Sequence, residues 1–396
     1  MKSFSGIYFL LTLAATVAVM FLRDKWATSI PELMSFGLAA AWIVRILAGR
    51  AKARLSPALL PLAGLLALGA IQLATGSTVY AWPTRVVMLY WAGNLAVLFC
   101  GLQFLDERRE RERFLRLLLY FGFGVALLST MQALTSQGKI YWVLTTEYSY
   151  QAIFGPFLYR NQYAAFMELI LPLALYGAVT NPKRRILYLA IATTIYASVV
   201  ACASRAGFVL ATVELGLVPL VSARGRMFSR KQLVNGSLVM VAMLLWMAVP
   251  AGPELLISKF GAADPFQQRR EFNEASWRMI RDRPLVGFGL GNWPTVYPGY
   301  ATFDDDKYTN QAHNDWAQWT VEGGVPLLAM MLFLAAWAVR GGLRTGWGLG
   351  VPIVFLHCFV DYPIQRPGVA VLFFLLLAGL ESGGTPAPAQ RIRHES

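Results

Sequence analysis

Stretches of apolar residues long enough to cross a membrane recur along nearly the whole chain, and they limit its fold more than any other feature. A spanning helix needs roughly 20 consecutive, mostly apolar residues. Because 56% of the 396 residues are hydrophobic, little of the chain is left for a separate soluble domain. We therefore expect an all-α polytopic membrane protein with about 12 transmembrane helices. The predicted spans are 4–22, 31–48, 57–75, 86–105, 114–134, 161–180, 186–203, 206–222, 233–250, 315–339, 347–361 and 367–381.

Basic residues fall in alternate loops between these predicted spans. In this arrangement those loops and both termini lie on one side, which the positive-inside rule assigns to the cytoplasm. The net charge of +13 then follows from topology, and no nucleic-acid partner is expected. We expect one transmembrane domain over 1–381 and a polar cytoplasmic tail over 382–396. The basic loops are 45–54, 108–116, 183–185, 224–231 and 340–344.

The opposite side carries basic residues that the topology rule does not explain. Two long loops are predicted there, at about 135–160 and 251–314, and we expect short helices in the second. Arg160 and Asn161 stand at the outer mouth of a predicted helix, and Arg205 stands at the boundary between two spans. The rigid donor fork of arginine suits phosphate oxygens, although contact with lipid headgroups is the alternative. Further external arginines at helix-like spacing are Arg269, Arg270, Arg278 and Arg281.

His313 is the only histidine in a predicted external loop. A neutral imidazole can accept a proton from an attacking hydroxyl group, and Asp315 or Glu322 could orient the ring. A purely structural role for this histidine stays open. Near the outer end of the eleventh span, His357 and Asp361 are one helical turn apart, which fits either a lock between helices or a direct role.

Two further features favour structural interpretations. The glycine-rich segment 287–292 follows no predicted strand and precedes no Gly-Lys-Ser/Thr, so it indicates a tight turn rather than a nucleotide loop. The three cysteines, Cys100, Cys202 and Cys358, lie in apolar stretches without a CxxC pair, which suggests neither zinc nor a disulfide framework.

Taken together, these segments resemble the O-antigen ligase and O-antigen polymerase superfamily of bacterial envelope glycosyltransferases. Two departures from the family pattern are visible: Gln162 stands where a histidine is often seen, and the pair Arg269-Arg270 leaves open which one corresponds to the family arginine. The resembling stretches, in chain order, are 155–165 (GPFLYRNQYAA), 204–207, 269–292 with its core RDRPLVGFGLGN, 313–324 (HNDWAQWTVEGG) and the turn Asp361-Tyr362-Pro363.

The resemblance implies a multi-span (GT-C-like), inverting glycosyltransferase of the bacterial inner membrane that uses no metal and no cofactor. Its donor would be a glycan on undecaprenyl pyrophosphate at the periplasmic face, held among membrane lipids. His313 and Arg205 would be catalytic. Arg160, Arg205, Arg269, Arg270, Arg278 and Arg281 would bind the pyrophosphate, and Asn161, Asn314, Asp315, Glu322 and Asp361 would support the site.

Three acceptors fit this resemblance. A ligase uses lipid A–core, a polymerase uses another lipid-linked glycan, and a protein-directed enzyme uses Ser or Thr. The compact length and the single large external loop favour the ligase. A transporter or flippase for a lipid-linked anion is the rival from another class, and it predicts polar groups at the membrane midplane, where Glu168 and Glu214 are the main candidates.

Overall fold

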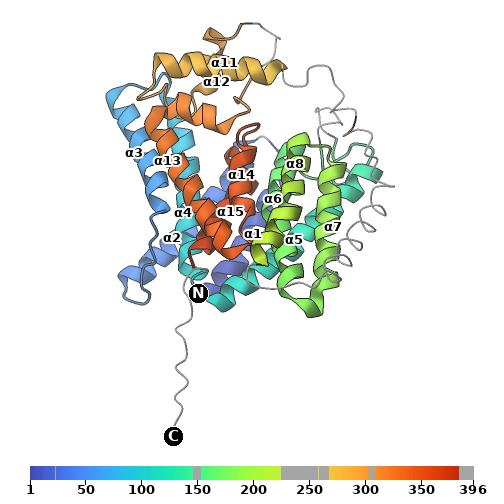
Figure 1. Cartoon of the computed structure of the whole chain (residues 1–396). Coiled ribbons are helices and arrows are strands. Elements are labelled where there is room, and N and C mark those ends of the chain that lie inside the picture. Colours follow the sequence, from blue (N-terminus) through green and yellow to red (C-terminus); the bar gives the residue numbers. More distant parts are fainter. Residues whose placement is uncertain (23, 146–152, 224–256, 258–266, 303–307, 383–396) are drawn as a thin grey trace.

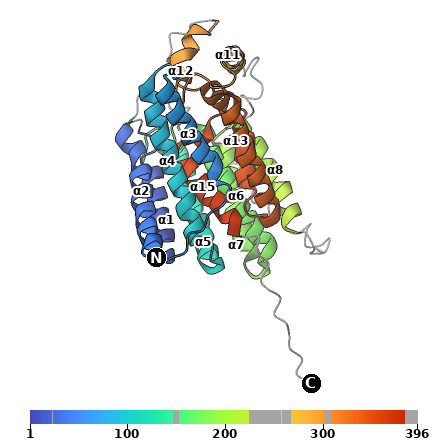
Figure 2. The same cartoon turned by 90° about the vertical axis from the view of Figure 1, so that its left-hand side faces the viewer.

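The computed structural model describes residues 1–22, 24–145, 153–223, 257, 267–302 and 308–382. Within these ranges the regular structure is helical, and most helices run roughly along one direction (Figures 1 and 2). The N-terminus lies at one end of the bundle. The bundle consists of α1 (Lys2–Ala18), α2 (Lys25–Leu47), α3 (Leu59–Thr75), α4 (Ala81–Phe104), α5 (Arg108–Thr135), α6 (Arg160–Thr180), α7 (Arg185–Ala201), α8 (Arg205–Ser222), α13 (Asp315–Thr345), α14 (Gly350–His357) and α15 (Pro367–Ser382).

The helices of the described ranges agree with a multi-pass membrane protein. Seven of them (α2, α4, α5, α6, α7, α8 and α13) are long and apolar enough to cross a bilayer, and α1, α3 and α15 are shorter apolar helices. The predicted span 347–361 needs correction, because α14 has only eight residues and a helix of that length is about 12 Å long. The predicted span 233–250 and nearly all of the predicted tail lie outside the described residues.

Two of the predicted basic loops meet at the end of the bundle where α1 begins. Lys2 Nζ lies 3.5 Å from Glu107 Oε2, and the Arg54 Nη2 atom lies 3.1 Å from Asp106 Oδ2. Arg113 Nη1 also donates to Ser3 Oγ at 2.6 Å. The loop after α2 and the start of α5 therefore lie on one side, as the charge pattern predicts.

Helices α6 and α15 form the centre of the bundle. From Tyr163 to Leu171 every residue of α6 is fully buried, and so is nearly every residue of α15 from Val369 to Leu380. A helix that is apolar on all sides is typical of a buried position. The two helices pack against each other, and the outer end of α6 lies close to the turn before α15.

A separate layer of short helices covers the end of the bundle opposite the N-terminus (Figure 1). It contains α11 (Gln267–Asp282) and α12 (Trp293–Val296). The inner face of α11 presents Phe272, Ala275 and Met279, which pack with Trp293 and Tyr297 in their own hydrophobic cluster. The short helices predicted in the second long loop are therefore confirmed by α11 and α12.

The glycine-rich segment 287–292 attaches this layer to the bundle. Phe288 N donates to Val321 O at 2.9 Å, and Gly289 N donates to Glu322 O at 3.0 Å. Both acceptors lie beside Gly324, where α13 kinks with φ 67° and ψ −167°. From α3, Gln72 Nε2 donates to Glu322 O at 2.9 Å. The predicted tight turn is thus confirmed, and it fixes α11 above the start of α13.

Candidate functional site

Three helices begin close together beneath α11: α6 at Arg160, α8 at Arg205 and α13 at Asp315. Ser204 Oγ donates to Asn161 Oδ1 at 2.7 Å, which joins the starts of α6 and α8. The backbone N–H of Asp315 donates to the carbonyl of Asp361 at 3.2 Å, which joins α13 to the turn before α15. Helix N-termini carry partial positive charge and free N–H groups, so their convergence favours an anion.

Side chains cap two of these helices. Ser204 Oγ accepts the Gly207 N–H at 3.1 Å at the start of α8. Asn314 Oδ1 accepts the Ala317 N–H at 3.1 Å at the start of α13, while its Nδ2 donates to Asn273 Oδ1 of α11 at 3.0 Å. Such caps fix the point at which a helix begins. They therefore hold Arg205 and His313 at defined positions.

The carboxylate of Asp361 is the centre of the cluster. Asn161 Nδ2 donates to its Oδ2, and the backbone N–H of Tyr362 donates to its Oδ1 at 2.9 Å. Arg269 Nη2 lies 3.8 Å from Oδ2, and His313 Nδ1 lies 3.5 Å from Oδ1. Burial alone would raise the pKa of Asp361, but the neighbouring His313 and the charge of Arg269 hold this pKa below its usual range. Asp361 is therefore an anion.

The His313 ring is held in a defined orientation. Its backbone has φ 52°, a left-handed conformation that is uncommon outside glycine and often marks a functional position. The ring stacks on Phe272 with centroids 5.9 Å apart, and its edge meets Tyr362 at 4.9 Å. With 30% of the side chain exposed, the imidazole is accessible to a substrate.

The carboxylate beside His313 belongs to Asp361, whereas the sequence predicts Asp315 or Glu322. Asp315 is fully buried, and its Oδ1 accepts from Gln365 Nε2 at 2.6 Å. Glu322 accepts the Gly291 N–H at 2.8 Å and so supports the glycine-rich turn. Helical spacing on α13 could not reveal Asp361, because this residue follows another helix.

Among the arginines of α11, only Arg269 meets the Asp361 carboxylate. Hydrophobic residues occupy the inner face of α11, and Arg270 lies exposed on the outward side. There Arg278 Nη2 donates to Tyr300 O at 2.7 Å, and the Arg281 guanidinium lies 5.5 Å above the Trp277 ring. Of the paired arginines, Arg269 is thus the one turned into the site.

Two further arginines lie at the same level. Arg205 and Arg269 are close enough to repel each other electrostatically. Arg160 Nη1 donates to Cys202 O at 3.5 Å, and Arg160 also lines a cavity of about 380 Å³ together with Lys139. The guanidinium groups of Arg205 and Arg269 thus lie near each other at the helix N-termini, and that of Arg160, at the start of α6, lines the adjacent cavity.

Arg366 also lies at the site, although it is not among the residues predicted to form it. Its Nη2 donates to Tyr362 Oη at 2.8 Å, and its guanidinium lies 4.7 Å from the Tyr362 ring centroid and 5.7 Å from that of Tyr159. The signal was its position five residues after Asp361 in an external turn, but only the packing of α6 against that turn brings it to Tyr159.

A buried pair lies beneath the site and connects α6 with α14. His357 Nδ1 lies 2.9 Å from Glu168 Oε1 and 3.0 Å from Oε2, and both side chains are fully buried. The His357 carbonyl accepts the Asp361 N–H at 3.1 Å. Glu168 therefore has a partner, and of the two roles considered for His357 the structure supports the lock between helices.

Fold and site define a multi-pass membrane protein with a cluster of arginines, a histidine and an ionised carboxylate at one end of its helical bundle. Residues 187–332 match the family model described as O-antigen ligase. This match confirms the resemblance to the O-antigen ligase and polymerase superfamily. The family supports a glycan-transfer enzyme that acts on lipid-linked glycans. A search of curated proteins finds no match for this chain.

Proposed function

We propose that this protein transfers a glycan from undecaprenyl pyrophosphate to an acceptor hydroxyl at the periplasmic face of the inner membrane, with lipid A–core as acceptor. The observation that carries the proposal is the His313–Asp361 contact with Arg269 beside it. A base held by a carboxylate and flanked by fixed cations is what displacement of a pyrophosphate requires.

His313 acts as the general base in this proposal. Because Nδ1 faces the anionic Asp361, the carboxylate favours the tautomer with a proton on Nδ1 and leaves the Nε2 lone pair free. The acceptor hydroxyl gives its proton to Nε2 while its oxygen attacks the anomeric carbon of the glycan. The bond from that carbon to the pyrophosphate oxygen breaks, with inversion at the anomeric carbon.

Arg160, Arg205 and Arg269 stabilise the negative charge that develops on the departing pyrophosphate. Preorganised cations in a partly dry site can supply the stabilisation that a metal ion supplies in other transferases. The converging N-termini of α6, α8 and α13 add partial positive charge at the same place. We assign a weaker role to Arg270, Arg278 and Arg281, namely attraction of the anionic donor to the outer surface.

The test is reconstitution of the purified protein with an undecaprenyl-pyrophosphate glycan and two acceptors, lipid A–core and a second lipid-linked glycan. We expect product on lipid A–core, followed by gel or mass spectrometry, with and without EDTA. Product on the lipid-linked glycan alone would assign a polymerase instead. Loss of all transfer in EDTA would overturn the metal-independent mechanism.

A second arm separates transfer from transport. His313→Ala should retain donor binding and lose transfer, because the base acts only in the chemical step. A transporter would instead move the labelled donor between leaflets without an acceptor, and His313→Ala would leave that movement unchanged. Full transfer activity in His313→Ala would remove this residue as the base.

A further inference from the structure

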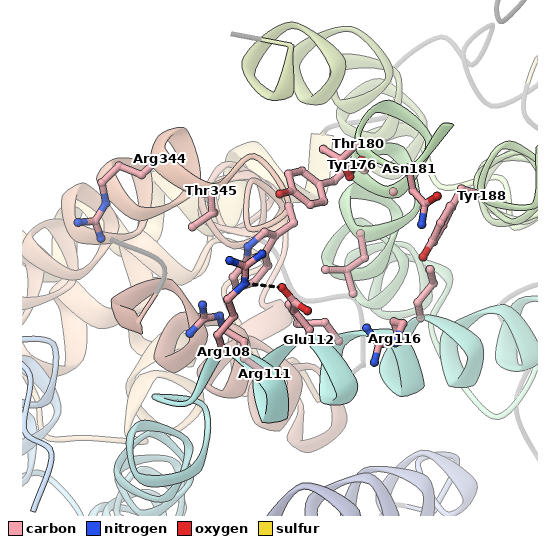
Figure 3. A pocket seen from close by; sticks show the side chains of 15 residues that line it. Arg108, Arg111, Glu112, Arg116, Tyr176, Thr180, Asn181, Tyr188, Arg344 and Thr345 are labelled. Atoms are coloured by element: carbon pink, nitrogen blue, oxygen red, sulfur yellow. Dashed lines mark hydrogen bonds and ion pairs between the residues drawn. The ribbon is translucent and has the colours of Figure 1, made fainter. Parts of the chain in front are cut away.

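A second polar cavity lies at the opposite end of the bundle from the candidate site. It has a volume of about 660 Å³ and opens between the first turns of α5, the last turns of α6 and the end of α13 (Figure 3). Arg108, Arg111 and Arg116 line it from α5, and Arg344 lines it from α13. A spacing of three residues makes Arg108 and Arg111 neighbours on the surface of α5, and Arg116 lines the cavity further along the same helix.

The lining of this cavity has an excess of positive charge. Glu112 is the acidic residue in its wall, and it pairs with Arg108 at 2.8 Å. Arg111 donates one N–H to the Leu105 carbonyl at 3.0 Å, and Arg344 donates one to the Leu380 carbonyl at 3.3 Å. Each of these guanidinium groups has five donors, so both retain donors for an anion. Four arginines and one glutamate leave three formal positive charges.

The cavity combines this charge with polar neutral groups and an apolar wall. Tyr176 and Asn181 from the end of α6 face the arginines across the cavity (Figure 3). Deeper along α5 and α6, the wall consists of Leu115, Leu119 and Leu173. A ligand with an anionic head and an apolar chain matches this order of surfaces, whereas a free anion matches only the outer part.

An adjoining cavity of about 630 Å³ enlarges the same region. It shares Tyr176 and Arg344 with the first cavity and adds Arg340. The positive-inside rule accounts for basic residues in the loops on one side of a membrane. It does not require that arginines from two helices line one cavity, so the cavity needs an explanation of its own.

We propose that this cavity binds the phosphodiester headgroup of an anionic phospholipid from the leaflet opposite the candidate site. The guanidinium groups bind the phosphate oxygens through charge-assisted hydrogen bonds, Tyr176 and Asn181 donate to headgroup oxygens, and the leucine wall contacts the first part of the acyl chain. Basic cavities between transmembrane helices are known to bind such headgroups. This inference does not depend on the proposed glycan transfer.

The experiment is native mass spectrometry of the full-length protein in detergent, titrated with dioleoylphosphatidylglycerol, with dioleoylphosphatidylcholine or with inorganic phosphate. The variant Arg116→Gln/Arg344→Gln removes two lining charges. Arg50→Gln/Lys52→Gln removes two exposed charges that do not line the cavity. We expect wild-type protein to retain phosphatidylglycerol, the lining variant to bind it at least about tenfold more weakly, and the control variant to match wild type.

Three results would overturn the proposal. Equal weakening by both variants would mean a general effect of charge. Equal retention of phosphatidylcholine and phosphatidylglycerol would mean that the cavity does not bind the anionic headgroup selectively. Equal occupancy by inorganic phosphate would mean a free-anion site rather than a lipid site. Matching melting temperatures of the two variants confirm that loss of binding is not loss of folding.

Discussion

His313 Nδ1 lies 3.5 Å from Asp361 Oδ1, although one residue precedes α13 and the other follows α14. The contact joins the partly exposed imidazole of the site to its central anion. It fixes which imidazole nitrogen faces the protein, and it leaves the other nitrogen for a substrate. The first prediction rests on this contact.

Replacing Asp361 by Asn should lower the rate of glycan transfer by about 10²- to 10⁴-fold, because the imidazole loses the carboxylate that sets its tautomer and stabilises its protonated form. The measurement is single-turnover transfer in proteoliposomes. Asp282→Asn, which alters a carboxylate of α11 bonded to Tyr300, serves as the control and should transfer at the wild-type rate. An unchanged rate in Asp361→Asn would contradict the role of the pair.

Arg269 and Arg270 are adjacent in α11, so replacing either one by glutamine removes the same charge from the same helix. Arg269→Gln should weaken donor binding roughly 10- to 100-fold, since a charge-assisted bond to phosphate is lost. Arg270→Gln should weaken it far less, because that side chain is exposed on the outward side. Equilibrium binding of a labelled polyprenyl pyrophosphate measures both. Equal losses would mean that long-range attraction, rather than contact, dominates.

The lowered pKa of Asp361 predicts the acid behaviour of the fold. Such a group stabilises the folded state above its unfolded pKa of about 3.9, and this contribution is lost as the pH falls through the lower, folded pKa. Arg269→Gln removes one cause of the lowering. The melting temperature of Arg269→Gln should therefore be lower than that of Arg270→Gln near pH 7 and should fall less on acidification to pH 3, because less stabilisation is left to lose. Coincident curves from pH 7 to pH 3 would contradict this expectation.

The kink of α13 should not tolerate a side chain at Gly324. A Cβ atom there would lie 2.5 Å from the backbone of Leu285, and the φ of 67° is itself unfavourable for alanine. Gly324→Ala should cost about 2 kcal/mol or more. Gly124→Ala, in α5 with open space around it, is the matched control and should not destabilise. Thermal denaturation in detergent compares the two, and equal melting temperatures would argue against a required kink.

The buried Glu168–His357 pair should show strong coupling. His357→Leu leaves a buried carboxylate without its partner and should cost about 3–5 kcal/mol, whereas Glu168→Met/His357→Leu should cost clearly less. A double-mutant cycle of thermal stability measures the difference. Additive effects of the two substitutions would mean that the contact contributes little.

Much of the fold could be predicted from the sequence, because burial in a membrane leaves a long apolar signal. The predicted spans 161–180 and 206–222 each begin within one residue of α6 and α8 and end at the same residue. The eight-residue α14 was not predicted, since apolar composition continues past His357 through the following turn and gives no helix end. Hydropathy reports what a segment can bury, and it does not report where the chain turns.

The site was predictable by residue type but not by contact. Arg160, Arg205 and His313 stood out because topology left their charge or polarity unexplained. The partner of His313 could not be read in the same way, because Asp361 reaches it only through the packing of α13 against the α14–α15 turn. The choice between Arg269 and Arg270 likewise depended on which side of α11 faces the bundle.

The repulsion between Arg205 and Arg269 has a consequence for turnover. Two like charges held near each other gain most from a ligand that carries two negative charges, and a polyprenyl pyrophosphate keeps those charges after it has lost its glycan. Under the proposed reaction, the spent carrier lipid competes with fresh donor for the same arginines. Product inhibition by this lipid would then limit the turnover rate. The rate of glycan transfer would depend on how quickly the carrier is removed from the outer leaflet.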